Sequence, residues 1–333
     1  MMKKLATMTL IPLLCCSAVT AGSLDTQKVA ADAKWVAHLD VEALLKSAIG
    51  KFILGEAEKK DSFIDGIAKI REALGFDPLT DVRGITLYGK KFGDESGVVL
   101  FDATVDQQKL LTLLEANEGH KTIQYGDYTL HEWIEAPKQP KGDDEGLLAG
   151  AGKTKFGCFY GQKLVVIASS VELLKGAIDV LDGKGENLAK SKGLAMLPKS
   201  ADGEFLVVAA EQIELPAKAS KPKTALARNI TDAAAQLGEV KGVLFLNISV
   251  VTKTAEKATQ LCRAAQGLIA IGQLGLQEDP NAPVLGEKIE VTPHDTTAHL
   301  SATMPTESFI KLLKYLAAKK RAKGQMVRLE PGA

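Results

Sequence analysis

The most regular pattern along the chain is a series of short segments in which apolar and polar residues alternate, with a tight turn between neighbouring segments. A Gly-Asp pair divides residues 122–133 in this way, and a Gly-Gln pair divides residues 156–167. Alternation with a period of two is typical of a half-buried strand, and a two-residue turn joins antiparallel neighbours. The pattern therefore predicts β-hairpins.

One stretch of the chain comes back later with the same order of residue types. Residues 81–89 and residues 239–247 both show an acid, Val, a base and Gly, followed by alternating aliphatic and aromatic residues. A segment with helical periodicity precedes each copy, at residues 63–74 and 224–237. We expect the two stretches to be equivalent strands of a duplicated unit. The predicted fold class is α+β: a tandem duplication of mainly antiparallel sheets with helices packed on one face.

Helices are predicted where apolar residues recur three and four positions apart. Asp40 precedes one such segment, residues 41–52, and can cap its N-terminus. Thr104, with Gln107 three residues later, and Ser169 stand at similar strand-to-helix junctions, where a hydroxyl is better explained as a cap than as a nucleophile. The longest helix, residues 255–274, shows a stripe that is rich in small residues and would pack closely: Ala258, Leu261, Cys262, Ala265, Leu268, Ile269 and Gly272.

The first 21 residues read as a secretory signal peptide. Two lysines precede an apolar run over residues 5–19, and small residues end this region at Ala21, ahead of Gly22. Cleavage after Ala21 fits best. Cys15 and Cys16 leave open a lipoprotein signal, which would anchor the chain to a membrane without spanning it. We therefore expect export, to the periplasm or the exterior.

The rest of the chain divides into two units of similar element order. A first α+β unit is expected over residues 29–182 and a second over residues 204–323. Residues 183–203 form the predicted linker, and residues 324–333 form a tail. The first unit carries an additional turn-rich loop, which the second lacks.

Charge and hydropathy restrict the partners of the mature chain. The full chain holds 41 basic and 41 acidic residues among 333, and the signal peptide removes two lysines and no acid. A neutral chain without a broad basic block does not favour nucleic acid. No later segment has the roughly 18 uninterrupted apolar residues of a membrane helix, so we expect no transmembrane span in the mature chain.

Two cysteines remain after cleavage of the signal, Cys158 in a predicted strand and Cys262 on the apolar stripe of a predicted helix. An exported protein can form a disulfide between them. Buried thiols that act as small hydrophobic residues explain the same positions. The sequence leaves both states open and favours the buried thiols.

Histidines and acids offer few candidates for chemistry. His294, Asp295 and His299 lie close in sequence, but two imidazoles without a clear third ligand make a weak metal site. His131 and Glu132 lack the second histidine that the helical zinc-protease motif requires. At least two of these five residues would have to converge in one cleft to form a hydrolase site.

Two other motifs are incomplete. Residues 150–154 resemble the end of a phosphate-binding loop, yet Leu147 occupies the position of its leading glycine. Ser308 and Lys311 have the spacing of penicillin-recognising enzymes without the two accompanying motifs. The sequence therefore predicts no catalytic, cofactor-binding or metal-binding residues, and no cofactor.

Residues 33–40, Ala-Lys-Trp-Val-Ala-His-Leu-Asp, and residues 84–89, Gly-Ile-Thr-Leu-Tyr-Gly, resemble exported proteins of unknown function from environmental bacteria. The likeness spans most of the mature chain and implies export. Such a family has no assigned catalytic residues to carry over.

The function we predict is that of an exported, noncatalytic binding or scaffolding protein of the cell envelope or periplasm, whose partner is an unknown protein or envelope component. One alternative is a carrier that holds an apolar ligand between sheet and helices, suggested by the stripe over residues 258–272. The other is a hydrolase without a recognisable motif. A sealed core would exclude the carrier.

Overall fold

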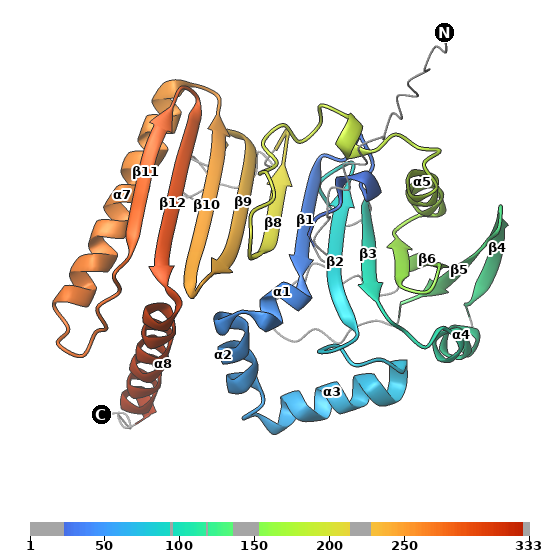
Figure 1. Cartoon of the computed structure of the whole chain (residues 1–333), viewed down its shortest axis with the longest axis horizontal. Coiled ribbons are helices and arrows are strands. Elements are labelled where there is room, and N and C mark those ends of the chain that lie inside the picture. The colour runs from blue at the N-terminus through green and yellow to red at the C-terminus, as the bar shows by residue number, and fades with distance from the viewer. Residues whose placement is uncertain (1–22, 94–95, 118, 136–152, 214–227, 329–333) are drawn as a thin grey trace, which may run out of the picture.

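A single antiparallel sheet organises the protein (Figure 1). The computed structural model describes residues 23–93, 96–117, 119–135, 153–213 and 228–328. The predicted signal peptide lies outside these residues. The strands of the sheet stand in the order β11 (Lys288–His294), β12 (Thr297–Pro305), β10 (Val243–Thr252), β9 (Ile230–Val240), β8 (Glu204–Ala210), β1 (Trp35–Asp40), β2 (Val82–Gly89), β3 (Gly97–Ala103), β7 (Leu164–Ala168), β6 (Thr154–Tyr160), β5 (Tyr128–Ile134) and β4 (Lys121–Tyr125).

The duplication is visible in the order of the strands. The first half runs β1-β2-β3-β7-β6 outward from the centre, and the second half runs β8-β9-β10-β12-β11 in the same way. β1 and β8 pair with each other, so both halves share one sheet, and the β4–β5 hairpin is an addition to the first half. The protein is therefore an α+β tandem duplication with an antiparallel sheet, as predicted.

The repeated sequence, however, does not mark equivalent strands, and that prediction was wrong. Residues 82–89 form β2, whose counterpart by strand order is β9. In the second copy, Lys241 and Gly242 form the tight turn between β9 and β10, both with positive φ. In the first copy, Gly84 lies within β2, where the pairing register shifts. The same residue types thus take different structures because their partner strands differ.

The predicted helix over residues 224–237 was also wrong, because residues 230–240 form β9. This strand lies between β8 and β10 and pairs with both. Ala234 and Gln236 are buried on one face, as strand alternation requires. Alanine favours helices, but here pairing on both edges outweighs that preference.

The described residues form seven α-helices. Their bounds are α1 (Val41–Lys46), α2 (Ala48–Ala57), α3 (Asp61–Leu74), α4 (Gln107–Glu115), α5 (Val171–Leu181), α7 (Ala255–Gln277) and α8 (Thr306–Arg328). Asp40 caps α1 and Ser170 caps α5 through side-chain oxygens. Thr104 does not cap α4; Asp106 does, and its carboxylate accepts a hydrogen bond from Lys109 N.

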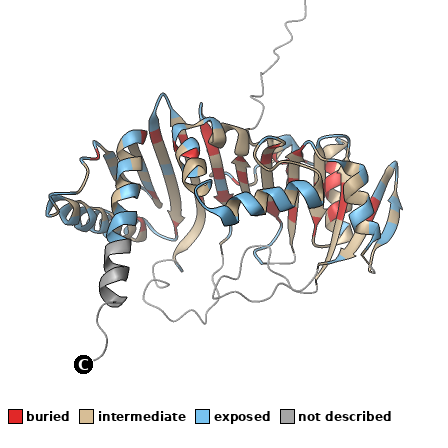
Figure 2. Ribbon diagram, turned by 90° about the horizontal axis from the view of Figure 1, so that it is seen from below, coloured by how far each residue is buried: buried red, intermediate tan, exposed pale blue. Residues whose placement is uncertain are grey.

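In the first half, α5 covers one face of the sheet. Val36, Tyr88, Val98 and Ala168 stand opposite one another in register across four neighbouring strands, so they share this face. They belong to the main hydrophobic core together with Leu174, Ala177 and Ile178 of α5. Figure 2 shows buried residues along the strands and on the helix that covers them.

In the second half, α7 covers the opposite face. The sheet face that carries Val36 in the first half carries the polar residues Ser249 and His299 in the second half. Ala298 and Leu244 point to the opposite face. α7 contacts β10, β11 and β12 and buries Ala258 and Cys262. Helix cover is therefore divided between the two faces, because the apolar positions of the strands change side between the halves. The expectation that the helices pack on one face was wrong in this respect.

Candidate functional site

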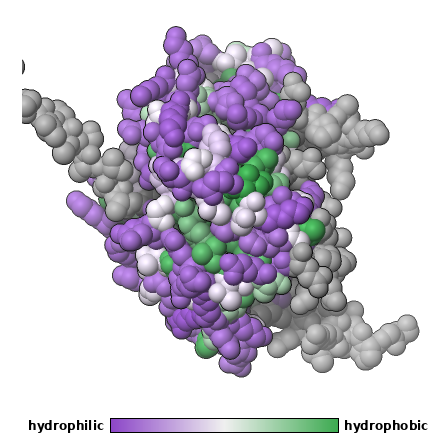
Figure 3. All heavy atoms as spheres, turned by 90° about the vertical axis from the view of Figure 1, so that its right-hand side faces the viewer, coloured by the Kyte–Doolittle hydropathy of each residue, from purple (hydrophilic) through white to green (hydrophobic). Residues whose placement is uncertain are grey.

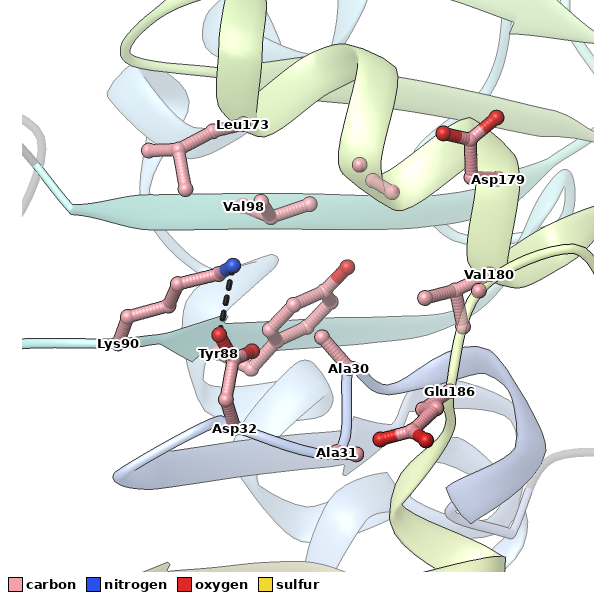
Figure 4. Close-up of a pocket in the computed structure, with 13 residues that line it drawn as sticks. Ala30, Ala31, Asp32, Tyr88, Lys90, Val98, Leu173, Asp179, Val180 and Glu186 are labelled. Carbon is pink, nitrogen blue, oxygen red and sulfur yellow. Dashed lines mark ion pairs between the residues drawn. The ribbon is translucent and has the colours of Figure 1, made fainter.

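A pocket of about 300 Å³ lies between α5, the sheet and the N-terminal segment that precedes β1 (Figure 4). The sheet contributes Tyr88 and Val98, and α5 contributes Leu173 and Ala177. This is the lower end of the range of about 300–1,000 Å³ that is usual for small-molecule sites. A second hollow, around Lys46 and Arg83, also lies in the first half.

Tyr88 is the central polar group of the pocket. Strand alternation turns its side chain toward α5, and only 2% of the residue is exposed. Its hydroxyl has no hydrogen-bond partner among the described residues. A buried polar group left unpaired costs about 1–3 kcal/mol. The hydroxyl is therefore placed to hydrogen-bond a molecule that enters the pocket.

Burial raises the pKa of the Tyr88 phenol, and the negative charge of Asp32 raises it further. The phenol consequently keeps its proton and can donate a hydrogen bond. In Figure 4 the ring lies beside Asp32, and its hydroxyl end is directed toward α5.

The segment before β1 closes one side of the pocket. Its backbone is held by hydrogen bonds from Ala31 N to Glu186 O (3.0 Å) and from Leu188 N to Val29 O (2.8 Å). At the mouth, Lys90 forms an ion pair with Asp32 at 2.7 Å, and both side chains are about half exposed. An exposed pair of this kind contributes little to stability, so it can open at small cost.

Gly176 leaves room on the α5 side. It lies in the middle of the helix, where glycine is unfavourable, and a Cβ atom built on it meets nothing within 4 Å. The side of α5 that carries Gly176 is therefore less filled than the side that carries Leu174 and Ile178, which are fully buried in the core.

A cluster of tyrosines and aspartates fixes the C-terminal end of α5. Tyr125 donates to Asp179 at 2.9 Å, while Tyr128 and Tyr160 donate to Asp182 at 2.6 and 3.1 Å. Lys184 also donates to Asp182 and, with the two tyrosines, lowers the pKa of that carboxyl. These bonds tie strands β4, β5 and β6 to α5, which positions the helix over the pocket.

Figure 3 looks onto the β4–β5 end of the molecule. That surface is mostly hydrophilic, with a small hydrophobic patch near its middle. No helix of the described residues combines the length and the apolar character that crossing a bilayer requires.

The structure does not bring the five candidate residues for a hydrolase together. His131 and Glu132 lie on β5, near one end of the strand order, whereas His294, Asp295 and His299 lie on or between β11 and β12, at the other end. Within the described ranges, no group of three His, Cys, Asp or Glu residues is placed to hold a metal ion.

Each of these histidines has a local partner. His131 is buried and stacks on His120, with 3.0 Å between ring nitrogens, and burial followed by the charge of His120 lowers its pKa. His299 lies 2.9 Å from the Ser249 hydroxyl, and His294 lies 3.4 Å from Asp295 in an exposed turn. Residues 150–152 of the loop resembling a phosphate site lie outside the described residues.

The small-residue stripe of α7 is only partly a packing surface. Ala258 and Cys262 are buried, but Leu268 is 72% exposed, and Ile271 and Leu274 are exposed as well. The expected ligand site along residues 258–272 is thus not enclosed at its C-terminal end. Cys158 and Cys262 are both free and buried, so the two thiols are not paired.

The polar face of the second half carries a second connected group. Gln236 donates to Glu204, the Asn247 amide approaches Gln236 Oε1 at 3.5 Å, and Ser301 donates to Asn247 at 2.9 Å. His299 and Ser249 lie on the same face. These polar residues lie across four neighbouring strands, β8, β9, β10 and β12.

Sequence reasoning missed the pocket, although two signals pointed toward it. Gly176 stands alone within an apolar helical pattern, which often has a packing or functional reason. Tyr88 occupies an inward position of an alternating strand, where its hydroxyl needs a partner. Neither signal identifies the N-terminal segment that completes the pocket.

No protein-family model matches the chain, and no curated protein matches it. Both results agree with a family whose function is not assigned. Among solved structures, three crystal forms of TP0453 are similar to this chain. Form III has a TM-score of 0.43 at 9% identity and covers 87% of this chain and 98% of that chain. Form I has a TM-score of 0.43 at 10% identity and covers 88% of this chain and 98% of that chain. Form IV has a TM-score of 0.42 at 10% identity and covers 87% of this chain and 97% of that chain. At these TM-scores the likeness carries no argument about function.

Proposed function

We propose that this chain is an exported, noncatalytic binding protein of the cell envelope or periplasm, and that it holds a small ligand in the pocket under α5. The observation that carries the proposal is the Tyr88 hydroxyl, which is buried and has no hydrogen-bond partner among the described residues although it borders a pocket of ligand size. The sequence suggested a ligand site along α7, whereas the proposed site lies in the first half of the chain.

The charged groups around the pocket support binding rather than catalysis. Asp32 is engaged by Lys90, and Asp179 accepts a hydrogen bond from Tyr125. Asp179 thus holds α5 against β4, and Asp32 already has a partner in Lys90, whereas a general base must be free to reach a substrate proton. A hydrolase is not proposed, because its five candidate residues lie near opposite ends of the sheet.

Export rests on the signal-like sequence of residues 1–21. Mass spectrometry of the chain purified from a bacterial periplasm would test it. We expect an N-terminus at Gly22 and no added lipid. An uncleaved chain retained in the cytoplasm would contradict export, and a mass increase from acyl chains on Cys16 would show an anchored form instead.

A scaffolding role remains a second candidate, favoured by the polar face of the second half. Asn247, Ser249, His299 and Ser301 present donors and acceptors over β10 and β12 without helix cover. Crosslinking in intact cells, compared between the unaltered chain and a variant with Ser301→Lys, would test it. A partner that crosslinks to the unaltered chain and is lost in the variant would support scaffolding.

Native mass spectrometry of the purified mature chain tests the ligand site directly. Gly176→Leu places a side chain in the open space of the pocket, and Gly66→Leu places the same side chain on α3, where a Cβ atom also meets nothing within 4 Å. We expect a copurifying small molecule with the unaltered chain and with Gly66→Leu, and its loss with Gly176→Leu. Equal retention by both variants would contradict the pocket as the site.

A further inference from the structure

We propose that the pocket under α5 selects an uncharged, largely apolar molecule that carries one hydrogen-bond acceptor oxygen, such as a ketone, and that Tyr88 donates to this oxygen. The inference rests on the proposed binding function and specifies the chemical class of the ligand. It follows from the lining of the pocket, the state of the Tyr88 hydroxyl and the charges at the rim.

The walls of the pocket are suited to an apolar body. Val98 from β3 and Leu173, Ala177 and Val180 from α5 present aliphatic side chains. Gly176 adds space without adding a polar side chain. An aliphatic portion placed here leaves water for apolar contacts, which is the main source of affinity in such pockets.

Tyr88 supplies the polar contact. Its hydroxyl is directed toward α5, is shielded from water and has no partner in the described part of the chain. A buried phenol that keeps its proton donates best to an acceptor oxygen. A ketone, ester or ether oxygen supplies that acceptor without bringing a charge.

The rim disfavours an anionic ligand. Three carboxylates line the pocket, those of Asp32, Asp179 and Glu186, against one ammonium, that of Lys90, which is already paired with Asp32. In Figure 4 the Glu186 carboxylate points toward Ala31, on the N-terminal side of the pocket. A carboxylate ligand would therefore meet like charge as well as lose its hydration.

A cationic head group is also disfavoured, for a different reason. The carboxylate beside the Tyr88 ring, that of Asp32, is already paired with Lys90, so an ammonium there would lose water and compete with Lys90 for this partner. The α5 carboxylate that lines the pocket, that of Asp179, accepts hydrogen bonds from Tyr125 at both of its oxygens. Placing a charged group of either sign beside the Tyr88 hydroxyl is therefore unfavourable in free energy.

Three probes with the same length of carbon chain test the class: 2-heptanone, heptanoate and heptylammonium, titrated into the full mature chain and followed by NMR. We expect 2-heptanone to bind about tenfold or more tightly than either charged probe, since burying a charge is the costlier step. Stronger binding of heptanoate or heptylammonium would overturn the inference.

Tyr88→Phe separates the hydrogen bond from the apolar contacts. The change keeps the ring and removes only an unpaired hydroxyl, so the fold should be retained. We expect it to weaken 2-heptanone binding by about two- to tenfold, the effect of one net hydrogen bond, and to leave heptane binding unchanged. An unchanged affinity for 2-heptanone would contradict the role of Tyr88.

The outcomes distinguish this inference from the proposed function. If a copurifying molecule is lost in Gly176→Leu but no 2-heptanone binds, the pocket is a binding site and the proposed ligand class is wrong. If no molecule copurifies and none of the probes binds, water alone fills the pocket and both proposals fail. Gly66→Leu should match the unaltered chain for every probe.

Discussion

Val36 of β1 and Ala209 of β8 stand directly opposite each other at the centre of the sheet, and both residues are 0% exposed. Both belong to the main core, together with Ala234 of β9. The seam between the two halves is therefore a buried strand pair and not a flexible connection. Removing side-chain volume at this seam should affect both halves together.

Val36→Ala should lower the free energy of unfolding by about 2 kcal/mol, as expected for deleting buried methyl groups. Urea unfolding followed by circular dichroism and tryptophan fluorescence measures it, and both signals should shift together. Val243→Ala is the control, because Val243 is 40% exposed at the start of β10, and should change stability by less than about 0.5 kcal/mol. Two separate transitions would contradict one cooperative sheet.

Gly238→Ala tests the strand that replaces the predicted helix. A Cβ atom on Gly238 would lie 2.6 Å from Gly203 O and would also clash with the Phe245 ring. We expect a loss of about 1–3 kcal/mol, typical of overpacking. Thermal or urea unfolding would measure it.

Gly267→Ala is the matched control for that prediction. Gly267 lies in α7, and a Cβ atom there meets nothing within 4 Å. We expect the control to stabilise the chain by about 0.4–1 kcal/mol, because alanine loses less backbone freedom on folding. Similar effects at the two glycines would contradict the placement of β9.

Asp279 should make part of the stability dependent on pH. Hydrogen bonds from Tyr315, from Asn281 N and from Lys319 lower the pKa of Asp279 to about 2. The folded value lies below the unfolded value of about 3.9, so this contribution is present above about pH 4. It is lost as the pH falls toward 2.

Asp279→Asn should accordingly be less stable than the unaltered chain at pH 6, and the difference should close between about pH 4 and 2. Urea unfolding of both proteins at several pH values measures the difference in stability. The titration of other groups affects both proteins equally and cancels in this difference. Asp295→Asn, in an exposed turn, serves as the control. A difference that stays constant down to pH 2 would contradict the bonded state of Asp279.

The cysteines should be unreactive in the folded protein. Burial raises the pKa of the Cys158 thiol to about 12, and burial also raises that of Cys262. Since the thiolate is the reactive form, a thiol reagent at pH 8 should label neither residue of the folded mature chain and both in denaturant. Rapid labelling, or a mass two hydrogens lower, would contradict buried free thiols.

Local patterns predicted much of the fold where the turn sequence sets the pairing. The β4–β5 hairpin forms across Gly126 and Asp127 as expected, with Tyr125 opposite Tyr128. The β6–β7 hairpin also forms, but Lys163 joins its turn, so Tyr160 pairs with Leu164 and the register differs by one residue. The cap at Asp40 follows from the chemistry of helix N-termini, whereas α5 is capped by Ser170 and not by the expected Ser169, one residue earlier. The candidate site was not predicted from the sequence, because its lining residues come from α5, β2, β3 and the segment before β1.

The sequence by itself determined the strands, hairpins and most helices, because alternation, turn residues and caps act over a few neighbouring positions. Tertiary structure alone decided that residues 230–240 form a strand, since only pairing with β8 and β10 on both edges offsets their helical preference. It also decided which strands correspond in the two halves. The pocket beside Tyr88 likewise exists only because distant elements pack imperfectly against one another, and packing at that scale leaves no local pattern in the chain.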